Sequence, residues 1–294
     1  MGYIYNALDN YFIKANTSDM GIPQLMWHIT NLCRLHCKFC FSAKSADEVD
    51  INDLNKYTRK FKALKVQKID LSGGEPMLYN FFPEICEALS KADIGITVTT
   101  RAVGLETNTN WVLHNWDKFA RVIVSVDVPS VQSFLELSGG REAWYRTENF
   151  LQQLKNRKCA NVRVNTVVTP YLLDSFLLNQ LAEIIEQYDC NEWCLIEAHP
   201  ANKKDTFDKV KISHEQFLHI VEKAKKIWEV KSDHRLLVRE EMNYTDYWVL
   251  YPDGILAKHT NGEQDDGRLF FLDTSIDEIL CKTRDKIWVP EAKV

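Results

Sequence analysis

The stretch "LMWHITNLCRLHCKFCF", residues 25–41, joins an apolar strand pattern to a loop that carries three cysteines. Cys33, Cys37 and Cys40 lie within eight positions, and none of the other five cysteines has comparable spacing. "LMWHIT" is apolar almost throughout, which is typical of a strand covered on both faces in a parallel sheet. Because chemistry gathers at the carboxyl ends of such strands, the sequence predicts that the cysteine loop is functional.

The rest of the chain alternates similar strand patterns with helical ones, which predicts an α/β fold with a parallel sheet. Six such units with right-handed crossovers favour an open, partial (β/α)₆ barrel of the TIM type over a flat sheet. The expected strands are 25–30, 68–72, 95–100, 121–127, 162–168 and 192–197, and the expected helices are 53–64, 81–91, 108–117, 143–156, 173–187 and 213–229.

After residue 230 the pattern changes. "DYWVLYPDGILAKHT" predicts a hairpin around Pro252-Asp253-Gly254, and "TSIDEIL" predicts a short capped helix. We therefore expect an N-terminal segment (1–22), a barrel (23–230) and a C-terminal extension (231–294) that covers one end of the barrel.

Composition excludes several classes of protein. The 294 residues are 45% hydrophobic and 26% charged, and the formal charge of −5 argues against a general nucleic-acid binder. No apolar run approaches the roughly 18–20 residues that span a bilayer, and the N-terminus lacks the order of a signal peptide. Eight cysteines are too few for a disulfide scaffold of this length, so we expect a reducing, cytoplasmic location.

Three thiolates on one loop indicate a metal centre, because thiolates select zinc or iron–sulfur clusters. Both kinds of site usually have four protein ligands. Three cysteines therefore leave one position for a ligand that is not protein. His36 is the alternative fourth ligand of a zinc site, but it is adjacent to Cys37, and two neighbouring residues rarely bind one small ion together. A zinc or iron–sulfur sensor without enzymatic activity stays open at this point.

Two motifs resemble those of the radical S-adenosylmethionine (SAM) superfamily. The cysteines have its C-x₃-C-x₂-C spacing, with Phe39 in the usual aromatic position, and "SGGEP" (Ser72 to Pro76) follows the second strand as the glycine-rich motif of that family does. The resemblance implies one [4Fe–4S] cluster on the three cysteines, with SAM bound to the fourth iron. It also implies an external one-electron reductant of the flavodoxin or ferredoxin type, and reductive cleavage of SAM to a 5′-deoxyadenosyl radical.

The same resemblance implies where SAM binds. Gly73 and Gly74 allow close approach of backbone to the ligand, and Glu75 is expected to pair with its ammonium group. Polar or apolar residues at the later strand ends are expected to complete the site. The predicted SAM-binding residues are Phe39, Ser72, Gly73, Gly74, Glu75, Pro76, Thr99, Ser125, Asp127, Asn165 and Ile196.

The substrate stays open between a peptide, a nucleotide and an aminosugar. Peptide-modifying or epimerising relatives match the tail pattern, whereas viperin-type nucleoside triphosphate dehydratases match "CKFCF" and "VNTVV". Arg101 replaces the asparagine of many relatives, and is expected to bind the SAM carboxylate or a substrate anion, or to lie on the surface. The predicted catalytic or substrate residues are Lys44, Arg101, Cys194, Glu197 and Cys281, of which the two cysteines are candidate hydrogen donors.

Overall fold

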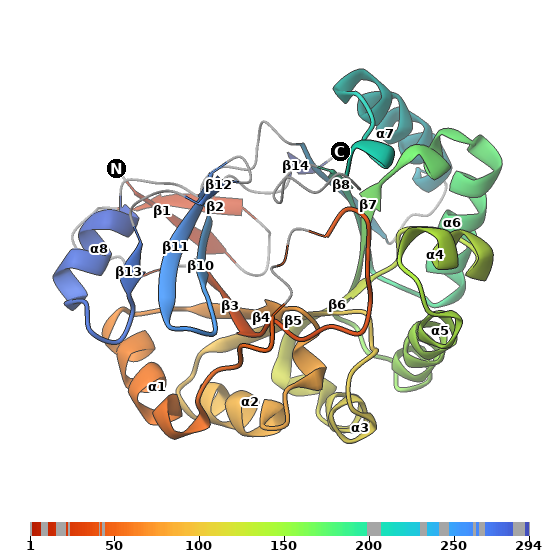
Figure 1. Cartoon of the computed structure of the whole chain (residues 1–294). Coiled ribbons are helices and arrows are strands. Elements are labelled where there is room, and N and C mark those ends of the chain that lie inside the picture. Colours follow the sequence, from red (N-terminus) through yellow and green to blue (C-terminus); the bar gives the residue numbers. More distant parts are fainter. Residues whose placement is uncertain are drawn as a thin grey trace.

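A curved parallel sheet covered by helices on its outer face forms the body of the protein (Figure 1). The computed structural model describes residues 2–6, 11–15, 22, 24–40, 42, 45–198, 207–229, 234–240, 247–260, 263–264, 268–284 and 292–293. The six expected strands are present in the expected order. They are β3 (Gln24–Thr30), β4 (Lys68–Gly73), β5 (Gly95–Thr100), β6 (Phe119–Ser125), β7 (Val162–Val168) and β8 (Glu192–Glu197).

Each of these strands pairs in parallel with the next, and a helical crossover connects them. The expected helices are confirmed as α1 (Leu54–Ala63), α2 (Phe82–Lys91), α3 (Glu106–His114), α5 (Arg141–Asn156), α6 (Ser175–Gln187) and α7 (His214–Trp228). The structure adds a short helix that the sequence did not predict, α4 (Val131–Leu137). Ser130 caps α4 by accepting a hydrogen bond from the backbone N–H of Ser133 at 3.2 Å.

Side chains alternate between the two faces of the sheet. Trp27 of β3 packs against Tyr57 and Phe61 of α1, with ring centroids 5.1 Å apart in both pairs. Trp193 of β8 packs likewise against Trp228 of α7, at 5.2 Å. The main core therefore lies between the sheet and the helices. Residues at the alternate positions, such as Cys194, point to the inner face of the curve, which is the face available for a ligand.

Two further strands lengthen the parallel sheet at its sides. β9 (Arg235–Arg239) pairs with β8, and β10 (Tyr247–Leu250) pairs with β3. β10 then turns into the antiparallel β11 (Ile255–Thr260), which confirms the hairpin; Gly254 in its turn has φ of 80°. Just after β10, the ring of Tyr251 lies 5.3 Å from that of His28 of β3. The sheet is not closed, in agreement with a partial barrel.

Of the remaining described strands, three extend the edges of this sheet and two form a separate two-stranded sheet, and a helix lies near the end of the chain. These elements are β1 (Gly2–Asn6), β2 (Tyr11–Ala15), β12 (Glu263–Gln264), β13 (Leu269–Phe270), α8 (Ile276–Arg284) and β14 (Ala292–Lys293). The Ser275 hydroxyl accepts from the N–H of Glu278 at 3.2 Å, as expected for a capped terminal helix. The domain boundaries at 22 and 230 stay predictions. Within the described residues, no helix is long and apolar enough to cross a membrane.

Candidate functional site

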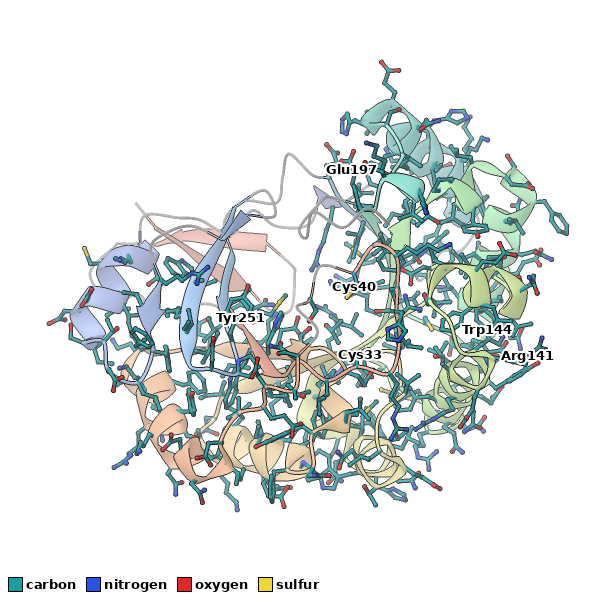
Figure 2. All side chains as sticks on the ribbon, viewed as in Figure 1. Cys33, Cys40, Arg141, Trp144, Glu197 and Tyr251 are labelled. Carbon is teal, nitrogen blue, oxygen red and sulfur yellow. The ribbon has the colours of Figure 1, made fainter. Side chains whose placement is uncertain are left out.

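The three cysteines leave β3 at the carboxyl edge of the sheet, where the sequence predicted them. Cys33, Cys37 and Cys40 carry free thiols and each is half-buried. Figure 2 shows Cys33 and Cys40 within the curve of the sheet. A tight turn helps to gather them, because the N–H of Cys40 donates to the carbonyl of Cys37 at 3.1 Å. The three cysteines therefore lie on one short turn at the carboxyl edge of the sheet.

The glycine motif holds the backbone that leads into this loop. The N–H of Gly74 donates to the carbonyl of Thr30, and the N–H of Glu75 donates to the carbonyl of Leu32, both at 2.7 Å. A Cβ on Gly73 would lie 2.1 Å from the Thr30 oxygen, and one on Gly74 would lie 2.1 Å from the Leu32 oxygen. Gly73 also has φ of 126°. Both glycines are thus required by contact with the cysteine loop itself, a reason that the sequence did not reveal.

The carboxylate of Glu75 accepts hydrogen bonds from backbone and side-chain groups of the protein itself. This carboxylate is 2% exposed and accepts from the hydroxyl of Thr100 at 2.5 Å, from the N–H of Arg101 at 2.9 Å and from the N–H of Met77 at 3.3 Å. Burial raises the pKa of this carboxyl, and the hydrogen bonds oppose that rise. Glu75 therefore ties the segment after β5 to the glycine motif. Its contact with the SAM ammonium stays a prediction.

The middle of the cysteine loop rests on the helix that the sequence missed. The N–H of His36 donates to the carbonyl of Ser138, and the N–H of Lys38 donates to the carbonyl of Leu137, both at 3.0 Å. These two carbonyls lie at the C-terminus of α4, where the last carbonyls of a helix have no partner within the helix. The loop is therefore held at its start and in its middle by backbone hydrogen bonds.

Arg101 is buried, so the expectation of a surface arginine is wrong. It is 8% exposed and forms an ion pair with Asp127, which is 1% exposed. Asp127 also accepts a hydrogen bond from the N–H of Val167 at 2.7 Å. The carboxylate expected to contact the ribose of SAM thus has two partners within the chain.

Other predicted residues meet on the inner face. The strand register places Ser125 of β6 beside Asn165 of β7, and Asn165 beside Cys194 of β8. Asn165 is 7% exposed, and its side-chain oxygen has no hydrogen-bond partner among the described residues. An amide oxygen in this state suits a ligand that donates a hydrogen bond. Cys194 and Ile196 instead pack with Leu237 in a small apolar cluster.

Two predicted substrate residues lie elsewhere. Glu197 faces α7, where its carboxylate pairs with Nδ1 of His214 at 2.9 Å. Cys281 is exposed on α8, far along the chain from the cysteine loop. Lys44 lies outside the described residues.

A buried carboxylate that the sequence did not single out lies on β4. Asp70 accepts from the hydroxyl of Thr99 at 3.1 Å, which gives the predicted Thr99 a partner within the sheet. Burial raises the pKa of Asp70 to about 6, while Thr99 and the nearby charges of Arg239, Lys68 and Arg163 lower it. A charged residue at alternate spacing in an apolar strand was the signal available in "KIDLS".

A second buried carboxylate gathers arginines from three neighbouring strands. Glu192 is 2% exposed, and its oxygens lie 2.9 Å from Nε of Arg121 and 2.7 Å from Nε of Arg163. Arg235 of β9 forms a further ion pair with it. These residues sit near the amino-terminal ends of their strands, so this network forms the floor below the inner face.

The cysteine loop fits an iron–sulfur cluster by the chemistry of its donors. Burial, Glu75 and the other two thiols raise the pKa of Cys33 to about 11, so a bound metal would supply the positive charge that a thiolate needs there. Within the described residues, no three His, Cys, Asp or Glu side chains are placed to hold a single metal ion. In a cluster each cysteine binds a different iron, so its sulfurs need not meet at one ion.

Comparison with known proteins identifies the family. The sequence model of the Radical SAM superfamily matches residues 27–188, which include the cysteine loop, the glycine motif, most of β3 and the whole of β4, β5, β6 and β7. The chain belongs to this superfamily. Its members bind a [4Fe–4S] cluster and SAM, and the residues of the loop fit both the donor set and the place in the fold.

Two curated relatives have different activities. One is an "S-adenosylmethionine-dependent nucleotide dehydratase" of Fibrobacter sp. (strain UWH6), 25% identical over 206 residues that cover 64% of this chain and 59% of that protein. The other is a "probable GTP 3′,8-cyclase" of Archaeoglobus fulgidus, 26% identical over 168 residues that cover 56% of this chain and 54% of that protein. This chain therefore matches less than two thirds of the length of either.

Solved structures share the fold at low sequence identity. SuiB of Streptococcus suis bound to its precursor peptide SuiA has a TM-score of 0.67 and 17% identity, covering 81% of this chain and 59% of SuiB. The enzyme anSMEcpe with AdoMet and a Cp18Cys peptide has a TM-score of 0.71 and 16% identity, covering 90% of this chain and 81% of that one. These likenesses show the fold alone.

Proposed function

We propose that this chain cleaves SAM reductively and takes a hydrogen atom from a small polar substrate bound on the inner face. The observation that carries the proposal is the half-buried cysteine loop, held by Gly74 and Glu75 at the carboxyl edge of the sheet. When bound there, a [4Fe–4S] cluster supplies the electron for the cleavage, and a protein of the flavodoxin or ferredoxin type is the proposed source of that electron.

The chain's own residues would bind SAM and exclude competing reactions. Ser72 of β4, Ser125 of β6 and Asn165 of β7 are the proposed polar contacts of the methionine and ribose groups. The Asn165 oxygen supports this assignment, because it is buried and has no described partner. Ile196, in its apolar cluster with Leu237, is the proposed contact of the adenine ring.

Charge on the inner face favours an anionic substrate, and we propose a nucleotide. Glu192 forms ion pairs with three arginines, and the charges of two arginines and a lysine act on Asp70, so cations outnumber these two carboxylates. Positive charge in a low-dielectric cavity attracts phosphate and repels a cationic aminosugar. The cations are Lys68, Arg121, Arg163, Arg235 and Arg239.

Peptide modification or epimerisation is the second candidate. The observation that favours it is the thiol of Cys194, which is buried in the inner-face cluster beside Asn165 and is the proposed hydrogen donor to a substrate radical. A nucleotide dehydratase does not require a thiol as hydrogen donor. The substrate test below separates the two candidates.

The test is anaerobic reconstitution with iron and sulfide, followed by dithionite and SAM. We expect release of 5′-deoxyadenosine, with Cys37→Ala as the inactive control. Nucleotides, peptides and aminosugars labelled with deuterium are then supplied separately. Deuterium in 5′-deoxyadenosine from the nucleotide would support the proposed substrate class, and deuterium from peptide only would replace it with the second candidate. A brown protein that never cleaves SAM would instead be a sensor, and would refute the proposal.

A further inference from the structure

The guanidinium of Arg101 lies against the cysteine loop. Its side chain is 9% exposed, and its central carbon is 5.8 Å from the ring centroid of Phe39 and 5.3 Å from that of Phe134. Guanidinium groups are attracted to aromatic faces at these distances. Arg101 therefore contacts two aromatic rings from different parts of the chain.

Both rings bear on the geometry of the cysteines. Phe39 stands between Cys37 and Cys40 in the sequence, so packing on its ring restrains the segment that carries both thiols. Phe134 belongs to α4, whose terminal Leu137 carbonyl accepts the N–H of Lys38 at 3.0 Å. Arg101 thus touches the loop directly and also touches the helix on which the loop rests.

The position of Arg101 is itself fixed by several elements. Its N–H donates to Glu75, its carbonyl accepts from the hydroxyl of Thr147 at 2.7 Å, and its side chain pairs with Asp127. Asp127 is held in turn by the N–H of Val167. A buried arginine with this many constraints is pre-organised, and a planar guanidinium can pair with a carboxylate and stack on rings at the same time.

We propose that Arg101 and Asp127 are positioning residues for the cysteine loop: the pair holds Phe39, and with it Cys37 and Cys40, in the arrangement that accepts the cluster. This assigns both side chains to the loop, while Nη1 of Arg101, which has no hydrogen-bond partner among the described residues, can still donate to a ligand. The statement that the pair favours cluster binding rests on the proposed function. The statement that the pair orders the cysteine loop applies to the protein without any cofactor.

The experiment measures amide hydrogen exchange in the peptide that covers residues 33–40, in the full-length protein without cluster. The double variant Arg101→Met/Asp127→Asn removes both charges together, which avoids leaving one buried charge unpaired. Arg101→Lys keeps the charge but removes the planar stacking group. The matched control is Arg121→Met, which removes a buried guanidinium from the barrel floor and leaves Glu192 two arginine partners.

We expect exchange in the loop to become roughly tenfold faster in the double variant and severalfold faster in Arg101→Lys. The control should exchange at the wild-type rate in this peptide. After anaerobic reconstitution, the double variant should also lose its iron to a chelator faster than wild type, and the Arg121→Met control should not.

Wild-type loop exchange in a folded double variant would overturn the proposal. If the double variant does not unfold cooperatively, it is misfolded and Arg101→Lys alone decides. Unchanged loop exchange in Arg101→Lys overturns the proposal, and faster loop exchange supports it. Loop exchange is independent of SAM cleavage. A chain that never cleaves SAM would therefore refute the proposed function and leave the role of the pair in holding the loop measurable.

Discussion

Gly74→Ala should disrupt the start of the cysteine loop. The new Cβ would lie 2.1 Å from the carbonyl oxygen of Leu32, and real Cβ contacts essentially never fall below 3.0 Å, so the two segments must separate by at least 0.9 Å. That movement takes the two 2.7 Å hydrogen bonds, from Gly74 to Thr30 and from Glu75 to Leu32, beyond normal length. Two lost hydrogen bonds and the residual crowding together cost about 2–4 kcal/mol.

Urea unfolding followed by circular dichroism measures this cost, and Gly95→Ala is the matched control. Gly95 also lies in the parallel sheet, but its Cβ would lie 3.3 Å from its nearest neighbour, the carbonyl oxygen of Gln67. The control should stay within about 1 kcal/mol of wild type. An equal effect of the two substitutions would show that the glycine motif is not held by contact with the loop, and would refute the reasoning.

Two other measurements test the site. Asp70 has a native pKa of about 6, above its ordinary value of 3.8, so the native state binds the extra proton and its contribution to stability falls as pH rises from about 4 to 6. Asp70→Asn should therefore become more stable relative to wild type over that range, by up to about 3 kcal/mol in urea titrations; a constant difference would contradict the raised pKa. Cys37→Ala should abolish iron binding without loss of ellipticity, because the cysteine loop lies at the edge of the sheet; loss of secondary structure would assign the loop a role in folding.

The strands of the barrel were predictable because burial on both faces leaves a strong sequence signal. "LMWHIT" and "VRVNTVV" are apolar almost throughout, and their observed bounds differ from the expected ones by one residue or none. The cysteine loop was predictable for a second reason: three thiols at fixed spacing have few purely structural uses. Both signals are local in the sequence.

The missed features depend on contacts between distant segments. α4 has only seven residues, too short for a helical period to stand out, and its function is to offer carbonyls to a loop about a hundred residues earlier. The pairing of Arg101 with Asp127 joins the ends of two strands, and neither side chain alone reveals whether its partner is protein or ligand. The sequence placed both residues at the site but could not assign their partners.

The contacts around the loop bear on how the cluster is acquired. Gly74 and Glu75 hold the entrance of the loop, α4 holds its middle, and Arg101 packs on Phe39 near its end, all without a cofactor. These contacts order the loop before iron binds, so less conformational entropy remains to be lost on assembly. Cluster binding should therefore stabilise the protein by nearly the full free energy of the iron–thiolate bonds. Substitutions at the three supports should weaken cluster retention even though none of them removes a thiol.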